Sequence, residues 1–159
     1  MEQTNFERMI QLAEDVFATK DDPDQLDVNE QVIERLLMIH PNSVSEYDDG
    51  NGPVAWLILI PSTKELMNQF FNKEISEKVL FLKTKIGEKY DSVYLCSGLV
   101  LPEYRRKGIT KELAKKALAE IRKQHEIKSL VAWPFTKEGN LASEDLARYL
   151  GLPLLLRQS

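Results

Sequence analysis

The chain has 159 residues, 43% of them hydrophobic, which is typical of a single globular domain spanning residues 1–159. One cysteine cannot form an intrachain disulfide framework, the net charge of −4 argues against general nucleic-acid binding, and no apolar run is long enough to cross a bilayer. Because the N-terminus also lacks the basic and apolar regions of a signal peptide, we expect a cytoplasmic protein with neither a nucleic-acid nor a membrane partner.

The first sixty residues predict two helices followed by a β-hairpin. Apolar residues at helical spacing indicate one helix over residues 5–19 and a second over residues 29–40, with Asn29 as its N-cap. Residues 43–47 alternate weakly as a strand, and an Asp- and Gly-rich turn joins them to a second strand over residues 54–60. Since this second strand is almost entirely apolar, we expect it to be buried on both faces.

A long segment separates this hairpin from the next predicted strand. Residues 61–65 are typical of a helix start, and two helical patterns follow around residues 66–72 and 76–88.

The centre of the chain predicts a strand, a basic loop and a helix. The strand covers residues 92–101, the basic turn covers residues 102–108, and apolar residues recur at helical spacing from Ile109 onward. The first N–H groups of such a helix have no intrahelical partner and lie at the positive end of its dipole, so phosphate is a suitable ligand there. Gly108 would let the backbone approach that ligand. An ordinary strand-to-helix connection with a solvated basic face remains the alternative.

The C-terminal region predicts two more strands and one more helix. A strand is expected over residues 128–135, a loop over residues 136–140 and a helix over residues 141–150 that Gly151 closes. Residues 154–156 form a short apolar run that predicts a terminal strand.

The central loop resembles the signature of a known family. Arg105-Arg106-Lys107-Gly108-Ile109-Thr110 is similar to the (Gln/Arg)-x-x-Gly-x-(Gly/Ala) motif of the GNAT family of N-acetyltransferases, except that Thr110 stands at a Gly/Ala position. The preceding residues 99–104 look like that family's lead-in strand and turn. A second similarity covers residues 140–152, where Asn140, Ser143, Leu146 and Gly151 match the family pattern.

This resemblance implies an α/β (α+β) fold, with a mixed, mostly antiparallel central sheet flanked by helices. Two departures from the family are expected: a helical insertion at residues 62–91, before the central strand, and a short C-terminus. An insertion at this place would lie over or beside the acceptor site. A decorative element, or one that forms a homodimer, is an equal alternative.

The resemblance also implies a function, which is transfer of an acetyl group from acetyl-CoA to a primary amine of a small molecule or peptide, by direct attack in a ternary complex and without a metal. Asn140 would bind the cofactor arm, or it would cap the last helix. The full set of residues implied to bind the cofactor is Leu99, Val100, Leu101, Arg105, Arg106, Lys107, Gly108, Ile109, Thr110, Lys111 and Asn140.

The residues that would move protons do not follow from the resemblance. Ala147 stands at the family's catalytic tyrosine position, and the central strand contains no acid where the family often has a glutamate base. The remaining candidates are Tyr94, Tyr149 and Glu46. A different class of function, a non-catalytic or weakly active acyl-CoA-binding or interaction module with the GNAT fold, is therefore kept as the alternative.

The charge distribution and the single thiol complete the expectations. Residues 1–50 carry thirteen acidic against three basic residues, whereas residues 51–159 carry twelve against eighteen. In the family the first two helices and the loop between them line the acceptor side, so the carboxylates of residues 21–27 predict a cationic acceptor, unless they are merely solvated. Cys96 lies on an apolar strand with no histidine nearby, which favours a core thiol over a nucleophile.

Overall fold

The computed structural model describes residues 3–20, 24–26, 29–134 and 137–158, and all statements below concern these residues. The elements of the fold in chain order are α1 (Asn5–Lys20), α2 (Glu30–Ile39), β1 (Val44–Asp48), β2 (Pro53–Ser62), α3 (Lys64–Phe71), α4 (Glu77–Lys83), β3 (Ser92–Val100), the 3₁₀ turn η1 (Pro102–Tyr104), α5 (Ile109–Arg122), β4 (Ser129–Ala132), α6 (Lys137–Leu150) and β5 (Leu154–Leu156).

The five strands form one sheet in the order β1-β2-β3-β4-β5. β1, β2 and β3 are antiparallel neighbours, whereas β4 pairs with β3 and β5 pairs with β4 in parallel. The antiparallel pairs contribute most of the paired residues, which confirms the expected mixed, mostly antiparallel sheet. β2 is buried along nearly its whole length, as its apolar sequence predicts.

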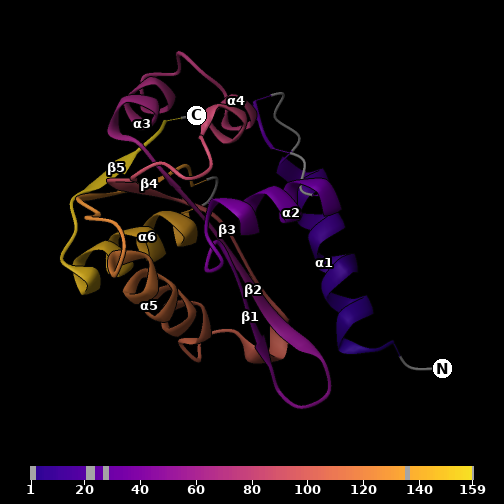
Figure 1. Ribbon diagram of the computed structural model, residues 1–159. Helices are drawn as coiled ribbons and strands as arrows, with labels where there is room; N and C mark the ends of the chain where they lie inside the picture. Colours follow the sequence, from indigo (N-terminus) through magenta and orange to yellow (C-terminus); the bar gives the residue numbers. More distant parts are fainter. Residues whose placement is uncertain (1–2, 21–23, 27–28, 135–136, 159) are drawn as a thin grey trace.

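Helices cover both faces of the sheet (Figure 1). α1 and α2 lie on one side, and α5 and α6 lie on the other. The main core includes Leu57 and Leu59 of β2 together with Leu113 and Leu118 of α5. A smaller cluster joins Met9 of α1 to the opposite face of β2 and β3. α5 thus buries most of the apolar stripe that its sequence periodicity predicts.

The predicted boundaries are correct at the first helices and wrong in three later places. The side chain of Asn29 caps α2 by accepting a hydrogen bond from the Val32 N–H at 3.0 Å, as expected. The helix predicted to start within residues 61–65 does begin there, because Thr63 is the N-cap of α3 and Lys64 its first residue, directly after β2 ends at Ser62. α4 ends at Lys83 rather than at residue 88, and Gly87 beyond it adopts a φ of +81°.

The strand predicted over residues 128–135 and the last predicted helix also differ from the structure, whereas the terminal strand over residues 154–156 is confirmed. β4 ends at Ala132, so the strand is shorter than the predicted 128–135, and Phe135 lies outside the described residues. α6 begins at Lys137, four residues before the predicted start at Leu141. Asn140 therefore lies in the first turn of α6 and is not its N-cap.

The insertion of residues 62–91 packs at the end of the sheet where β3 begins, around α3 and α4 (Figure 1). Glu77 of α4 accepts hydrogen bonds from the Leu26 N–H at 2.6 Å and from the Tyr94 hydroxyl. Arg35 of α2 donates to the carbonyls of Leu82 and Thr84. These contacts make the insertion a brace between the N-terminal helices and the central strand.

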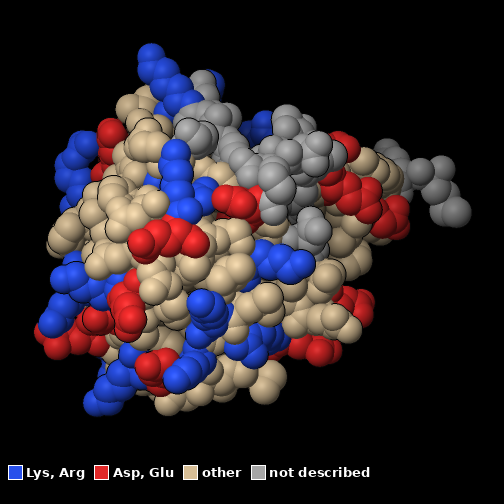
Figure 2. Space-filling model, turned by 90° about the horizontal axis from the view of Figure 1, so that it is seen from above, with Lys and Arg blue, Asp and Glu red and all other residues tan. Residues whose placement is uncertain are grey.

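The described part of the chain contains no helix that is both long and apolar enough to cross a membrane. Figure 2, seen from above, shows basic and acidic side chains interspersed over much of the surface, with acidic side chains gathered on the side where α1 lies in Figure 1. The acidic N-terminal third of the sequence is thus also an acidic region of the surface.

Candidate functional site

The sheet opens beside the second half of β3. The parallel pairing of β3 with β4 stops at Leu95 and Ala132, whereas β3 continues to Val100. A cavity of about 700 Å³ fills this opening. Its walls come from β3, from the turn that leads into α5, from residues 132–134 and from α6. Within the described residues, the edge of β3 that faces this cavity has no strand partner beyond Leu95, so its peptide groups can pair with a ligand.

The turn before α5 is shaped as an anion site. Arg106 and Gly108 both adopt left-handed backbone conformations, with φ of +64° and +75°. The N–H of Glu112 is the first to bond back into the helix, to the Gly108 carbonyl at 3.0 Å. The N–H groups of the first three helical residues therefore have no intrahelical acceptor and point out of the helix start.

The backbone conformation gives a reason for glycine at position 108 in addition to the expected approach to a ligand. A Cβ atom at Gly108 would meet no protein atom within 4 Å, so close packing within the protein does not require glycine. The φ of +75° favours glycine at this position, because residues with a Cβ are disfavoured at positive φ. Gly108 therefore fixes the direction in which the chain enters α5.

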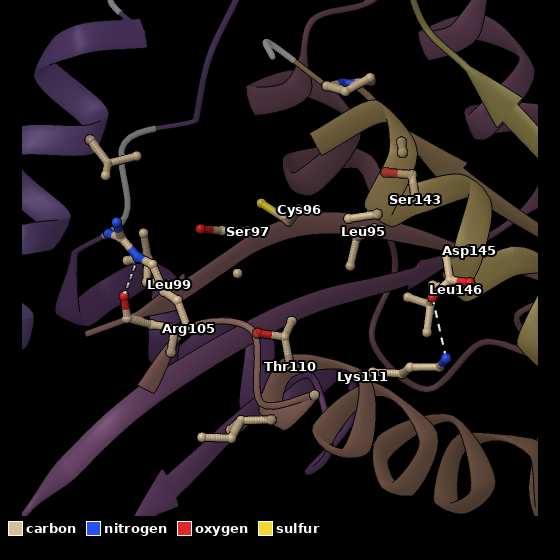
Figure 3. Close-up of a pocket in the computed structure, with 18 of the residues that line it drawn as sticks. Leu95, Cys96, Ser97, Leu99, Arg105, Thr110, Lys111, Ser143, Asp145 and Leu146 are labelled. Carbon is tan, nitrogen blue, oxygen red and sulfur yellow. Dashed lines mark hydrogen bonds and ion pairs between the residues drawn. The ribbon is translucent and has the colours of Figure 1, made fainter. Parts of the chain in front are cut away.

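Two of the basic side chains at this cavity already have partners in the protein (Figure 3). Nε of Arg105 donates to the Val100 carbonyl at 3.1 Å, and Nζ of Lys111 lies 3.2 Å from Oδ2 of Asp145. The first contact closes the turn against the end of β3, and the second ties α5 to α6. Both contacts hold the walls of the cavity in place, and both are solvent-exposed and modest in strength.

A second cavity, of about 790 Å³, lies on the other side of β3, under α1 and α2. Its floor is a grid of side chains from three neighbouring strands. One row is Glu46, Trp56 and Leu99, which are paired across β1, β2 and β3. The next row is Val44, Ile58 and Ser97. The roof consists of residues from α1, from α2 and from the N-cap of α2: Phe6, Ile10, Ala13, Glu14, Asn29, Glu30, Ile33 and Glu34.

The two cavities meet at Ser97 and Leu99, which line both. Ser97 is only 7% exposed, and no described residue forms a hydrogen bond with its hydroxyl. Figure 3 shows Ser97 and Cys96 projecting from β3 into the open space of the first cavity. A buried hydroxyl of this kind usually has a partner, so the junction of the cavities is suited to a polar ligand atom.

A β-bulge determines which way Ser97 points. The pairing of β2 with β3 changes register between Ile58, opposite Ser97, and Leu59, opposite Leu95, so Cys96 is an extra residue in β3. Side chains alternate along a strand, so one extra residue turns all later side chains to the opposite face. Ser97 and Leu99 consequently face α1 and α2, and Gly98 faces α5.

Most of the residues expected to bind the cofactor line the first cavity. These are Leu99, Val100, Arg105, Arg106, Gly108, Ile109, Thr110 and Lys111. The other three residues, Leu101, Lys107 and Asn140, do not line this cavity. Leu101 packs with Met9 on the α1 side, Lys107 lies with its ammonium 5.3 Å from the centre of the Tyr104 ring, and Asn140, in the first turn of α6, is not among the lining residues.

The three candidate proton-transfer residues lie in separate places. Tyr94 is buried in the core, where its hydroxyl donates to Glu77, and burial raises the pKa of Tyr94 well above its ordinary value. Tyr149 is on the surface under Lys111 and Lys115. Neither tyrosine lines a cavity. Glu46 does line the second cavity, where its Oε1 accepts a hydrogen bond from the Trp56 indole at 2.8 Å.

The acidic loop expected to face the acceptor is only partly described, and its described part has another role. Residues 21–23 and 27–28 lie outside the described residues. Asp24 is 2.9 Å from the guanidinium of Arg157, which is buried between the rings of Phe70 and Trp133. Asp24 is therefore a structural ion-pair partner. The described residues of the insertion 62–91 line neither cavity.

Sequence reasoning missed Ser97 at the junction of the cavities and three glutamates that line the second cavity. Ser97 belongs to an apolar run, and the bulge that turns it inward leaves no periodic signal. Glu14, Glu30 and Glu34 come from two helices that converge only in the fold. A polar Ser-Gly pair within an otherwise apolar strand was the one available signal. Cys96, expected to be a core thiol, is half-buried against the core and also lines the first cavity.

Comparisons with known proteins give a family match for most of the chain. The model of the acetyltransferase (GNAT) family matches residues 7–152. An aminoglycoside acetyltransferase from an uncultured soil metagenomic sample, solved in complex with sisomicin, is 20% identical; the alignment covers 91% of this chain and 77% of that chain, with a TM-score of 0.49. The aminoglycoside antibiotic 6'-N-acetyltransferase of Acinetobacter haemolyticus is 14% identical, over 79% of this chain and 87% of that chain, with a TM-score of 0.40. None of the curated protein sequences compared matches this chain.

Proposed function

Because this chain belongs to the acetyltransferase (GNAT) family, we propose that it transfers an acetyl group from acetyl-CoA to a primary amine of a small molecule or peptide, by direct attack in a ternary complex. The observation that carries this proposal is the junction of two cavities at Ser97 and Leu99. A donor bound in the first cavity and an acceptor bound in the second would meet there without a covalent enzyme intermediate.

The first cavity suits the donor. The N–H groups at the start of α5, with the side chain of Arg106 nearby, form the proposed site for the pyrophosphate. The unpaired edge of β3 from Cys96 to Val100 offers backbone groups to the pantetheine arm, which carries amides of its own. Bound in this way, acetyl-CoA supplies the activated acyl group, and its thioester end would reach the junction.

The reaction itself needs a neutral amine and a protonated leaving group. The amine nitrogen attacks the thioester carbonyl carbon, a C–N bond forms, the C–S bond breaks, the nitrogen loses a proton and the sulfur gains one. We assign the hydroxyl of Ser97 as the hydrogen-bond donor to the reacting acyl group. Glu46, the one sequence candidate that lines the acceptor cavity, is proposed to accept the amine proton through water. Positioning of the two substrates supplies the rest of the rate.

The second cavity suits a cationic acceptor. Four of its lining residues are glutamates, and no basic residue lines it within the described part of the chain. The negative potential of such a cavity raises the local concentration of protonated amines. A cationic acceptor was also expected from the sequence, but from a loop whose described acid, Asp24, is instead paired with Arg157.

Turnover distinguishes this enzyme from a module that only binds acyl-CoA. Ala147, 4% exposed, stands at the family's catalytic tyrosine position and favours the non-catalytic alternative. The test is to mix the protein with acetyl-CoA and a panel of primary amines and to follow release of free thiol and formation of the N-acetyl product. Amine-dependent thiol release supports the enzyme; tight acetyl-CoA binding without release for every amine would favour the binding module.

A further inference from the structure

The acceptor cavity has a polar base and apolar walls. At the base, the residue Ser97 is 7% exposed, and its hydroxyl forms no hydrogen bond with a described residue. Along the walls, Phe6 is 55% exposed and Ile10 is 40% exposed, although both are large apolar residues. Trp56 adds an aromatic surface against Phe6, with ring centres 6.2 Å apart. A ligand that satisfies both features has a polar end and an apolar body.

The rim of the same cavity is acidic. Glu14 on α1 and Glu30 and Glu34 on α2 line it and are exposed, and none of the three forms an ion pair with a described residue. Glu30 and Glu34 are four residues apart on one helix, a spacing at which like charges repel and destabilise the helix. This repulsion is relieved when a cation binds between or beside the carboxylates.

The charge that the rim attracts belongs to a different nitrogen from the one that reacts. A nitrogen must be neutral to attack the thioester, and the junction where it attacks is formed by the uncharged residues Ser97 and Leu99. Resting on the function proposed above, we infer that the acceptor is a small diamine or polyamine, with one amine at Ser97, a hydrocarbon spacer along Phe6 and Ile10, and a second, protonated amine at the rim.

The size of the cavity favours a small molecule over a basic peptide. A volume of about 790 Å³ lies within the range of roughly 300–1,000 Å³ that is usual for small-molecule sites. A linear diamine also matches the order of chemical groups from base to rim, because its middle is uncharged.

The test compares amines that differ only in the second charge. Wild-type protein is titrated by calorimetry with diaminobutane, diaminohexane and diaminooctane and with butylamine, hexylamine and octylamine, and the same amines are assayed for thiol release from acetyl-CoA. We expect the best diamine to exceed the monoamine of equal length by about tenfold in affinity and in kcat/KM, since each exposed carboxylate contributes little alone. The advantage should shrink as ionic strength rises.

A pair of double variants assigns the effect to the rim. Glu30→Gln with Glu34→Gln removes two rim charges, and Glu65→Gln with Glu74→Gln removes two exposed charges of the insertion, which lines neither cavity. The first variant should lose the preference for the diamine over the monoamine of equal length. The second should keep the preference.

The outcomes separate this inference from the proposed function. Three results would overturn the inference while leaving N-acetyl transfer intact. The first is equal affinity and equal kcat/KM for diamines and monoamines, and the second is a diamine preference that the rim variant retains. The third is a basic peptide that is acetylated better than every diamine. Diamine binding that depends on Glu30 and Glu34, in a protein that releases no thiol with any amine, would instead overturn the catalytic proposal and support the inference.

Discussion

Gly98 of β3 and Thr110 of α5 pack closely together in the wall of the first cavity, and a Cβ atom added at Gly98 would lie 3.2 Å from Cγ2 of Thr110. Thr110 occupies a position where the family signature has glycine or alanine. The missing side chain at residue 98 supplies the space that the larger side chain at residue 110 needs. The departure from the signature is thus accommodated by one residue on the facing strand.

This relationship predicts a compensating pair. Gly98→Ala should destabilise the protein by roughly 1 kcal/mol, because Thr110 is stiff at χ1 and cannot easily move its methyl group away. Thr110→Ser removes that methyl group, so the double variant should recover most of the loss. The measurement is urea unfolding of the wild type, both single variants and the double variant. Strictly additive effects would show that the two residues do not interact.

The loop before α5 predicts a charge-specific loss of donor binding. Gly108→Glu places a carboxylate where the pyrophosphate is proposed to lie, so calorimetric titration with acetyl-CoA should show no binding. Gly87→Glu is the matched control, because Gly87 also has a positive φ and open space around it but lies in the insertion, away from both cavities. The control should bind acetyl-CoA as the wild type does. Equal affinities for all three proteins would rule out this loop as the donor site.

Neighbouring residues at the bulge of β3 should differ in their effect on the rate. Ser97→Ala removes the hydroxyl at the junction and is expected to lower kcat roughly 100-fold, with a smaller effect on KM, as for loss of a donor to a developing oxyanion. Cys96→Ala, one residue away in the same cavity, should keep acetyl transfer within a few-fold. Ser97→Thr retains a hydroxyl and should recover part of the rate. A folded Cys96→Ala protein without activity would show that the thiol is the nucleophile after all.

How much of this arrangement could be predicted varies with the range of the interactions. The periodicity of β2 and α5 and the turn before α5 are local properties, so the sequence predicts the main elements and the residues of the donor loop. The bulge at Cys96 depends on the register with β2, which strand alternation cannot specify. The second cavity depends on how α1 and α2 lie over the sheet, so Glu14, Glu30 and Glu34 could not be grouped in advance.

The ion pair of Asp24 with Arg157 illustrates the same limit at the C-terminus. Arg157 is 3% exposed, and its Nε donates to the Phe70 carbonyl at 2.9 Å. We predict that Asp24→Asn lowers the free energy of unfolding by about 2 kcal/mol, less than the roughly 3–5 kcal/mol typical of a broken buried pair, because the Asp24 side chain is half-exposed. Glu120→Gln, which breaks an exposed pair with Lys123, should cost less than about 1 kcal/mol. Similar urea midpoints for the two variants would contradict this assignment.

His125 predicts a dependence of stability on pH. Its Nδ1 accepts a hydrogen bond from the Tyr90 N–H at 3.1 Å, and burial, with nearby His40 and Lys89, lowers the pKa of His125 below 6.5. The folded protein therefore binds fewer protons than the unfolded chain in this range, so the stabilisation present above pH 6.5 is lost as the pH falls through the folded-state pKa.

The measurement is the Tm from neutral to mildly acidic pH. His125→Asn keeps an acceptor near the Tyr90 N–H but cannot be protonated, so the part of the Tm decrease due to His125 should disappear. An unchanged pH profile in this variant would assign the effect to other groups.

The extra residue in β3 also affects how this enzyme can change over evolutionary time. A substitution anywhere from Ser97 to Val100 alters one side chain and leaves the others facing as before. A shift of the pairing by one residue, which would place Cys96 instead of Ser97 opposite Ile58, would remove the bulge and turn this whole stretch over, so that Gly98 would face the second cavity and Ser97 would face α5. Backbone pairing would survive, yet the two cavities would exchange their shared walls. Lineages of this protein should therefore vary the residues of this strand far more readily than its pairing register with β2.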